Sequence, residues 1–238
     1  MQICGINLIF DCGVIYRCIT RSQSLFYYGD CTFGVTAVFL QLIMTPEREA
    51  KIQRVLNYRQ PDLAVVLENV HDIHNISAVM RTCDAVGVQN LYVLNNAINP
   101  HKRFGKKSSA SAEGWLSVHQ YEDTAKCMQE LKKRYEHIFA THLGVRSQSL
   151  YELNLAQSVV LVFGNEHAGV TEECLSYCDG NFIIPQVGMV QSLNISVACA
   201  VTLYEALRQR QVADRYNGSN KLPESEYKAL AKEWGIYE

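Results

Sequence analysis

The fold of this 238-residue chain is decided at residues 184–198, where the sequence reads IPQVGMVQSLNISVA. An apolar strand ends there, a glycine-containing loop follows, and a Ser/Asn-rich segment opens the next helix. A turn of this kind exposes several backbone N–H and C=O groups at one place, where a small polar ligand can be held. An ordinary helix N-cap is the alternative interpretation, and for Ser192 alone it is the simpler one.

A second polar segment, NISAVMRTC at residues 75–83, follows the apolar run LAVVL at residues 63–67. A continuous apolar run between polar residues predicts a strand buried on both faces. Asn75 is then expected to cap a helix whose apolar residues recur on one side. Arg81 follows Asn75 by six residues, so the two side chains project about 120° apart around the helix axis. Arg81 could equally be a solvated surface charge.

The third segment, VVLVFGNEHAGV at residues 159–170, is a buried strand that runs into a turn with two glycines. Gly164 is expected to let the backbone approach a ligand closely, and Gly169 to permit a tight turn into a helix near Thr171. The turn lacks the Lys-Ser/Thr of a phosphate-binding P-loop. The chain also lacks a strand followed by the three-glycine dinucleotide pattern.

The order of predicted elements indicates an α/β fold with an open, mostly parallel sheet and helices on both faces. Strands are predicted at residues 63–70, 90–95, 137–142, 158–163 and 181–184, and helices at residues 75–86, 122–134, 170–178 and 193–211. Such alternation implies right-handed crossovers and a ligand site at the carboxyl ends of the strands.

Taken in order, residues 75–81, 163–169 and 184–198 resemble the three motifs of the SPOUT superfamily, specifically its TrmH-type RNA ribose 2′-O-methyltransferases. Flanking segments, among them 44–48, 59–63 and 68–71, are similar to the family's tRNA guanosine enzymes. The resemblance implies a C-terminal trefoil knot, a homodimer and S-adenosylmethionine as cofactor. It also implies methylation of a ribose 2′-OH in RNA, with guanosine 18 in the D-loop of tRNA as the expected target.

The resemblance also implies roles for individual residues. Arg81 matches the family's catalytic arginine. Because a guanidinium is almost never deprotonated, we expect it to bind the substrate phosphate and polarise the attacking hydroxyl rather than act as a base. Asn75, Glu166, Ser192 and Asn194 are expected to orient Arg81 and shape the catalytic site. The cofactor slot is expected to be built by Thr141, Leu143, Gly164, Ile184, Ser192 and Leu193.

Basic residues form three local groups, although the net charge of −2 does not favour a polyanionic partner for the chain as a whole. Each group could be a solvated face. Three of them on a slightly acidic chain suggest a localised footprint for RNA phosphates. The residues expected to bind RNA are Arg54, Arg59, Lys102, Arg103, Lys106, Arg208 and Arg210.

The nine cysteines give no pattern typical of a metal site. Cys174 and Cys178 stand four residues apart on a predicted helix, but no second pair accompanies them, so we predict no metal. An odd number of cysteines, in a chain without a secretory signal, indicates reduced thiols and a cytoplasmic location.

Three regions are expected along the chain: an extension at 1–43, a methyltransferase domain at 44–211, and a linker with a short amphipathic helix at 212–238. Residues 31–43 are apolar but only about half as long as a bilayer requires, so no membrane association is predicted. Because Met44 opens the family-like sequence, our hypothesis is that residues 1–43 reflect a start codon placed too far upstream. An organelle-targeting or membrane-associating extension is the alternative.

Two other functions stay open at this point. One is methylation of ribosomal RNA by the same fold, which would usually bring a separate RNA-binding domain. The other is a non-catalytic RNA-binding protein that keeps the fold. The joint presence of Asn75, Arg81, Glu166, Ser192 and Asn194 favours an active enzyme.

Overall fold

The computed structural model describes residues 2–3, 6–10, 15–19, 24–28, 44–101, 112–144, 147–165 and 168–236. Two compact units divide the chain, Met1–Met44 and Thr45–Glu238. The first unit contains an antiparallel sheet of four strands in sequence order: β1 (Gln2–Ile3), β2 (Ile6–Phe10), β3 (Ile15–Ile19) and β4 (Ser24–Tyr28).

The second unit is built on a seven-stranded sheet in which every described strand pair is parallel. Its strands are β5 (Gln60–Glu68), β6 (Val88–Leu94), β7 (Ser117–Tyr121), β8 (His137–Thr141), β9 (Gln148–Ser149), β10 (Val159–Phe163) and β11 (Gly180–Ile183). They lie side by side in the order β7-β6-β5-β10-β8-β11-β9. The predicted fold class and all five predicted strands are confirmed. Two strands were not predicted: β7, a half-buried edge strand, and β9, which has only two residues.

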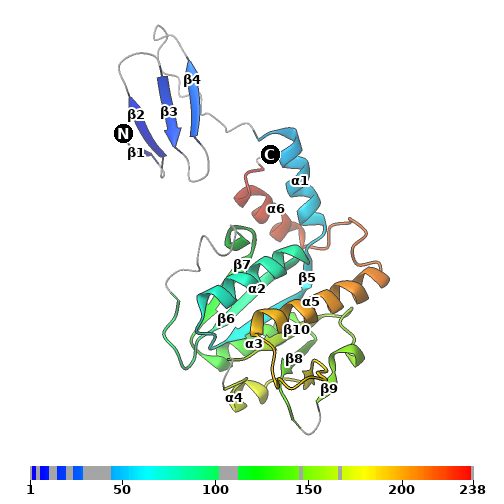
Figure 1. Ribbon diagram of the computed structural model, residues 1–238. Helices are drawn as coiled ribbons and strands as arrows, with labels where there is room; N and C mark the ends of the chain where they lie inside the picture. Colours follow the sequence, from blue (N-terminus) through cyan, green and yellow to red (C-terminus); the bar gives the residue numbers. More distant parts are fainter. Residues whose placement is uncertain are drawn as a thin grey trace. The chain divides into compact units, whose positions relative to one another are not determined.

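Helices cover both faces of this sheet, as predicted (Figure 1). α2 (Ile73–Ala85) and α5 (Ile195–Val212) pack together on one face, and α3 (Thr124–Arg134) and α4 (Glu172–Leu175) cover the other. The helix predicted at residues 170–178 is much shorter in the structure, where α4 has only four residues. Thr171 caps it. α1 (Pro46–Asn57) was not predicted. It begins where Thr45 accepts a hydrogen bond from the Arg48 N–H, directly before a proline that favours the first helical turn.

The core forms two layers, one on each side of the sheet, and β5 shows how the sequence divides between them. Leu63, Val65 and Leu67 face α2 and α5, whereas Ala64 and Val66 face α3 and α4. All five side chains are fully buried. Alternate residues of a strand point to opposite faces, so a strand covered on both sides has to be apolar throughout. The prediction that LAVVL is buried on both faces is confirmed.

The expected cap of α2 is wrong. Asp72, not Asn75, caps this helix, and its carboxylate accepts a hydrogen bond from the His74 N–H at 2.8 Å. Asn75 therefore lies inside the first turn of α2. Its side chain is available for contacts with another element instead of with its own backbone.

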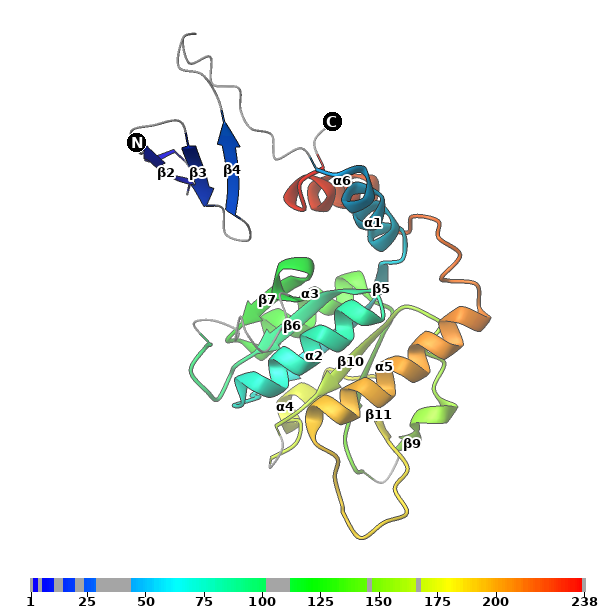
Figure 2. The same ribbon diagram turned by 45° about the horizontal axis from the view of Figure 1, so that its top comes forward.

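The C-terminal region contains the predicted amphipathic helix, α6 (Glu224–Glu233), which packs against α1 (Figure 2). Leu230 and Ala231 are buried in this contact, and Trp234 follows them with its ring edge-on to Trp115. The sequence left open whether this helix packs on the body or on a partner subunit, and in the structure it packs on α1 of its own chain.

The strand order reverses between β5 and β10. From β5 the chain proceeds to β6 and β7 on one side, and then crosses to β8, with β10 later inserted beside β5. The carboxyl ends of two strands that diverge in this way leave a crevice, which is where open α/β sheets bind ligands. The trefoil knot stays an implication of the family resemblance. Among the residues described, no helix combines the length and apolar character needed to cross a membrane.

Candidate active site

A cavity of about 790 Å³ lies at the carboxyl ends of β8, β10 and β11. Its size falls in the range of small-molecule sites. The structure brings all six residues of the expected cofactor slot to the wall of this cavity: Thr141, Leu143, Gly164, Ile184, Ser192 and Leu193. The segment between β11 and α5 that supplies three of them extends away from the body in Figure 2. Phe163, Phe182 and Ala198 also line the cavity and were not predicted; their position at strand ends and in the first turn of α5 was the available signal.

The loop after β10 is closed by its own backbone. The Asn165 N–H donates to the Gly169 carbonyl at 3.0 Å, and the Gly169 N–H donates to the Asn165 carbonyl at 2.9 Å. Gly169 has φ of +69°, so the predicted tight turn is confirmed. A Cβ atom on Gly164 would lie 2.2 Å from the Gly169 backbone. Gly164 is therefore needed for close contact between two parts of this loop, and not only beside a ligand as the sequence suggested.

Asn194 joins the start of α5 to α2. Its side-chain oxygen accepts hydrogen bonds from the Ser196 N–H at 2.9 Å and the Ser196 hydroxyl at 2.6 Å, so Asn194 caps α5. Its amide nitrogen donates to Asn75 Oδ1 at 3.1 Å. Two residues that are far apart in sequence thus meet next to the cavity, whereas Ser192 lines the cavity and is not the cap.

Arg81 lies on the exposed surface of α2 and does not line the cavity. It follows Asn75 by six residues, a rise of about 9 Å along the helix. Among the residues that the structure describes, none forms a hydrogen bond or an ion pair with the Arg81 side chain. Its guanidinium is therefore accessible to a ligand from solvent. Glu166, also expected at the catalytic site, lies outside the described residues.

Arg59 is not available to RNA, which contradicts the sequence expectation. Its side chain is fully buried, and its guanidinium donates to Asp84 Oδ1 at 2.7 Å and to the Trp115 carbonyl at 2.8 Å. The ring of Trp234 covers it at 5.3 Å. Arg59 thus holds β5, α2 and the C-terminal region together.

Arg210 is a second correction, for the same reason. It is fully buried and donates to Asp62 Oδ1 at 2.6 Å and to the carbonyls of Leu155 and Gln157 at 2.9 and 2.6 Å. It therefore fixes the end of α5 to the sheet. Arg208 is exposed and pairs with Glu205 through two hydrogen bonds of 2.8 Å.

The other expected RNA-binding residues divide into two sets. Arg54 is exposed on α1, close to the exposed Lys51. Lys102, Arg103 and Lys106 lie outside the described residues.

A buried polar network, which the sequence did not reveal, supports the loops at the strand ends. Glu68 ends β5 without exposure to solvent, and its carboxylate accepts from the Thr171 hydroxyl at 2.6 Å and from Asn96 Nδ2 at 3.2 Å. Asn96 Nδ2 also donates to the Thr124 hydroxyl at 2.7 Å. Each hydrogen-bonded partner offsets the cost of burying the carboxylate. The polar pair Asn95-Asn96 at the end of a predicted strand was the signal for this network.

The part of the chain that the structure describes contains no group of three or more His, Cys, Asp or Glu side chains that could hold a metal ion. Cys178 Sγ donates to the Cys174 carbonyl at 3.4 Å. Burial raises the pKa of Cys127 to about 12, so this thiol stays protonated at neutral pH.

Comparisons with known proteins agree with the geometry. Residues 62–204 match the SpoU rRNA Methylase family. The tRNA (guanosine(18)-2′-O)-methyltransferase of Escherichia coli (strain K12) is 42% identical over 195 residues, which are 81% of this chain and 83% of that protein. The crystal structure of the A. aeolicus TrmH/SpoU tRNA modifying enzyme aligns with a TM-score of 0.74 and 36% identity, over 79% of this chain and 95% of that one.

A second similar structure carries a ligand. The SpoU methyltransferase AviRb from Streptomyces viridochromogenes, in complex with the cofactor AdoMet, aligns with a TM-score of 0.58 and 26% identity, over 64% of this chain and 59% of that one. The matched segment of the present chain includes most of β5, all of β10 and β11, and all three motifs, of which those at 163–169 and 184–198 line the 790 Å³ cavity. On this evidence the chain belongs to the SpoU methylase family.

Proposed function

We propose that this protein transfers a methyl group from S-adenosylmethionine to a ribose 2′-OH of RNA. The observation that carries the proposal is the cavity at the carboxyl ends of β8, β10 and β11, which residues of the motifs at 163–169 and 184–198 line. Asn75 of the remaining motif is joined to Asn194 beside this cavity. The cavity walls fit the methyl donor, because Leu143, Ile184 and Leu193 supply apolar contact for an adenine ring. The exposed backbone of the loops after β10 and β11 supplies hydrogen bonds for its polar edge.

For this reaction the protein has to position the methyl donor and the ribose, and to stabilise the charge that develops on the ribose oxygen. S-adenosylmethionine, when bound, supplies an activated sulfonium methyl group. The ribose oxygen must lie in line with that group, and it loses its proton as the new carbon–oxygen bond forms. Asn75 and Asn194 are placed to orient the ribose, because their amides meet beside the cavity. Arg81 is permanently protonated, so it holds the substrate phosphate and stabilises negative charge on the oxygen, while that phosphate accepts the proton.

The substrate we propose is guanosine 18 of tRNA. This rests on the named activity of the Escherichia coli relative, which shares 42% identity over most of both chains. RNA is expected to approach the exposed cations Arg54, Arg81 and Arg208, together with Lys102, Arg103 and Lys106.

The substrate is tested with unmodified tRNA transcripts, S-adenosylmethionine labelled in the methyl group, and mass spectrometry of the digested nucleosides. We expect 2′-O-methylguanosine from the normal transcript. None is expected from a matched transcript that carries 2′-deoxyguanosine at position 18, because the acceptor oxygen is missing. Methylation of a ribosomal RNA fragment without methylation of tRNA would contradict the substrate and leave the family intact.

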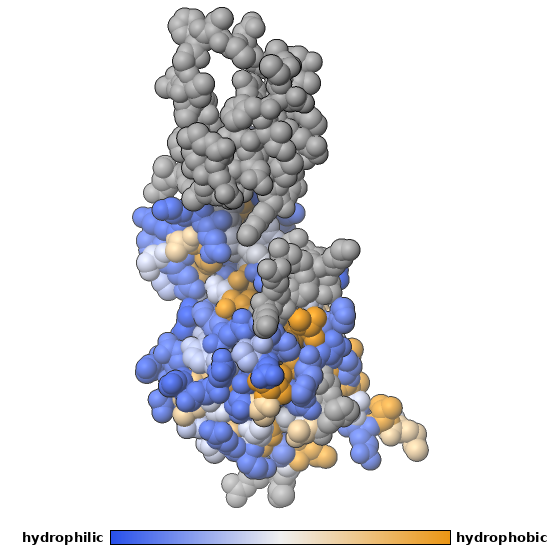
Figure 3. All heavy atoms as spheres, turned by 90° about the vertical axis from the view of Figure 1, so that its left-hand side faces the viewer, coloured by the Kyte–Doolittle hydropathy of each residue, from blue (hydrophilic) through white to orange (hydrophobic). Residues whose placement is uncertain are grey.

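The active protein is proposed to be a homodimer. Several large apolar side chains that surround the cavity mouth or lie on α5 are exposed: Leu143, Val187, Met189, Val190, Val197 and Tyr204. Residues 195–204, the first part of α5, are mostly apolar around the helix, although only one side packs on the sheet and α2. On the face of the molecule that Figure 3 shows, the described residues form a mostly hydrophilic surface with small apolar patches. A helix that is apolar all round is usually covered, and a second copy of the chain would cover this one.

We expect light scattering to give twice the 26.9 kDa mass of one chain. Tyr204→Asp should shift the mass toward that of one chain, because it places a charge in the apolar contact. Tyr151→Asp is the matched control, since Tyr151 is about as exposed but lies near β9. A monomeric native protein at micromolar concentration would refute the dimer.

A cytoplasmic location completes the proposal. All five cysteines for which the structure describes a side chain are free thiols, which suits a reducing compartment.

A further inference from the structure

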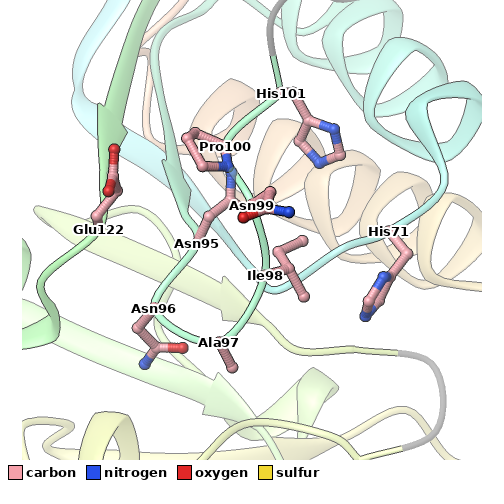
Figure 4. Close-up of a pocket in the computed structure, with 9 residues that line it drawn as sticks. All are labelled: His71, Asn95, Asn96, Ala97, Ile98, Asn99, Pro100, His101 and Glu122. Carbon is pink, nitrogen blue, oxygen red and sulfur yellow. The ribbon is translucent and has the colours of Figure 1, made fainter.

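A second cavity, of about 660 Å³, lies at the carboxyl ends of β5, β6 and β7. It flanks the β5–β10 reversal on the side opposite to the cofactor cavity. Figure 4 shows His71 and His101 on one side of this cavity and Glu122 on the other, with residues 95–100 running between them in this view. Neither the three motifs nor the proposed methyl transfer uses these residues.

One residue of this cavity has an unmet hydrogen-bonding capacity. Asn95 is 3% exposed, and neither its amide nitrogen nor its amide oxygen has a hydrogen-bond partner among the residues that the structure describes. Leaving both atoms of a buried amide unpaired destabilises the folded chain, so such a group calls for an explanation, and a ligand that pairs with it is one. The residues that follow, Ala97, Asn99 and Pro100, are exposed. A small movement of this segment would open the amide to a ligand.

Asn95 and Glu122 are neighbours across the sheet. Leu94 pairs with Tyr121, and the Asn95 N–H donates to the Tyr121 carbonyl at 2.8 Å. Adjacent strands lie about 4.8 Å apart. The Asn95 amide and the Glu122 carboxylate therefore leave the strand ends at a spacing similar to the width of the hydrogen-bonding edge of a nucleic-acid base. The cavity wall carries amides, imidazoles and an acid, and no Lys or Arg among its described residues. That composition disfavours a phosphate group and suits a base, whose edge is polar and whose faces stack on rings.

The two cavities are joined by one residue, Asn69. Its side chain donates to Asn96 Oδ1 at 2.5 Å and accepts from the Ala97 N–H at 3.0 Å, on the side of the second cavity. Its carbonyl accepts from Asn165 Nδ2 at 2.9 Å, and Asn165 lines the cofactor cavity. A nucleotide with its ribose at the mouth of the cofactor cavity would therefore have its base close to the second one.

We propose that this second cavity binds the guanine of the nucleotide that is methylated. The Glu122 carboxylate accepts from the guanine N1–H and the 2-amino group, and the Asn95 amide donates to O6. His71 and His101 flank the base. The inference rests on the proposed function, because it assumes a guanosine substrate. It adds the residues that select this base.

The test compares tRNA transcripts with guanosine or inosine at position 18, since inosine lacks only the 2-amino group. We expect Glu122→Gln to lower kcat/KM for guanosine at least about 10-fold and to bring the guanosine-to-inosine ratio close to one. Asn95→Ala should lower kcat/KM for both substrates by a similar factor and preserve their ratio, because both bases carry O6. Glu130→Gln, an exposed change on α3, is the control and should alter neither value.

The outcomes separate the two proposals. If the native protein methylates no guanosine at position 18, the proposed function fails. If it does so, and Glu122→Gln leaves the guanosine-to-inosine ratio unchanged, the base site is wrong, whether or not overall activity falls. Glu122 is exposed, so this variant is expected to fold. Thermal unfolding of Asn95→Ala shows whether its loss of activity reflects damage to the fold.

Discussion

Replacing Arg81 by alanine should lower kcat for tRNA methylation by about 10²–10³-fold, the usual cost of removing one charge-stabilising group from an active site. The Kd for S-adenosylmethionine should stay nearly the same, because Arg81 lies on the exposed face of α2 and does not line the cofactor cavity. Single-turnover kinetics and calorimetry measure the two quantities separately. Arg81→Lys should also be slow, since an ammonium lacks the planar fork that a guanidinium offers to a phosphate.

Lys133→Ala provides the control for this experiment. Lys133 is an exposed cation on α3, which covers the opposite face of the sheet, so its loss should leave kcat and the cofactor Kd unchanged. Near-normal turnover by the Arg81→Ala protein would remove Arg81 from the mechanism. A large loss of cofactor affinity would instead make Arg81 part of the cofactor site.

The second large effect is expected on stability. Arg210→Met should lower the free energy of unfolding by about 3–5 kcal/mol, as is typical when one partner of a buried ion pair is removed. The loss should fall at the lower end, because Asp62 keeps its ion pair with Arg215 at 2.6 Å. The carbonyls of Leu155 and Gln157 lose a donor and cannot replace it with water as long as the site stays buried. Urea denaturation followed by circular dichroism measures the change.

Arg208→Ala is the matched control, two residues earlier on α5. Its side chain is 64% exposed, and its buried partner Glu205 keeps a hydrogen bond from Gln209 Nε2 at 2.8 Å, so the free energy of unfolding should fall much less than for Arg210→Met. If Arg208 contacts an RNA phosphate, its loss should weaken tRNA binding and reduce the salt dependence by about one unit of slope. Equal stability of the two variants would show that Arg210 is not a structural residue.

The sequence predicted the parts of the molecule in which local pattern and final environment agree. The run at residues 63–67 can be buried on both faces only in a covered sheet, and the structure places it in the middle of one. Gly169 predicted a tight turn, and in the structure its φ is positive, as such a turn requires. The residues carried over from the family for the cofactor slot share one cavity, because they lie at or just after the ends of β8, β10 and β11, parallel strands whose carboxyl ends lie at the same edge.

What the sequence could not predict depends on partners that are distant along the chain. Nothing near Arg210 distinguishes it from the exposed Arg208, because its carboxylate partner lies 148 residues earlier. Arg59 is similar, with Asp84 and Trp115 as partners. The cap of α2 was misplaced because Asp72 and Asn75 are both good capping residues, and only the backbone decides between them. The second cavity was missed because Asn95 and Glu122 become neighbours only when β6 and β7 pair.

The insertion of β10 beside β5 has a consequence for synthesis of the protein. β5 is the second unit's first strand, yet its partner on this side follows 96 residues later, with Val159 beside Leu63. At about 5–20 residues per second, a ribosome needs roughly 5–20 s to supply it. During that time β5 presents an apolar edge with unpaired backbone groups, which invites association with other nascent chains. β5, an interior strand of the finished sheet, thus depends on protection, by a chaperone or by fast completion, while the chain is being made.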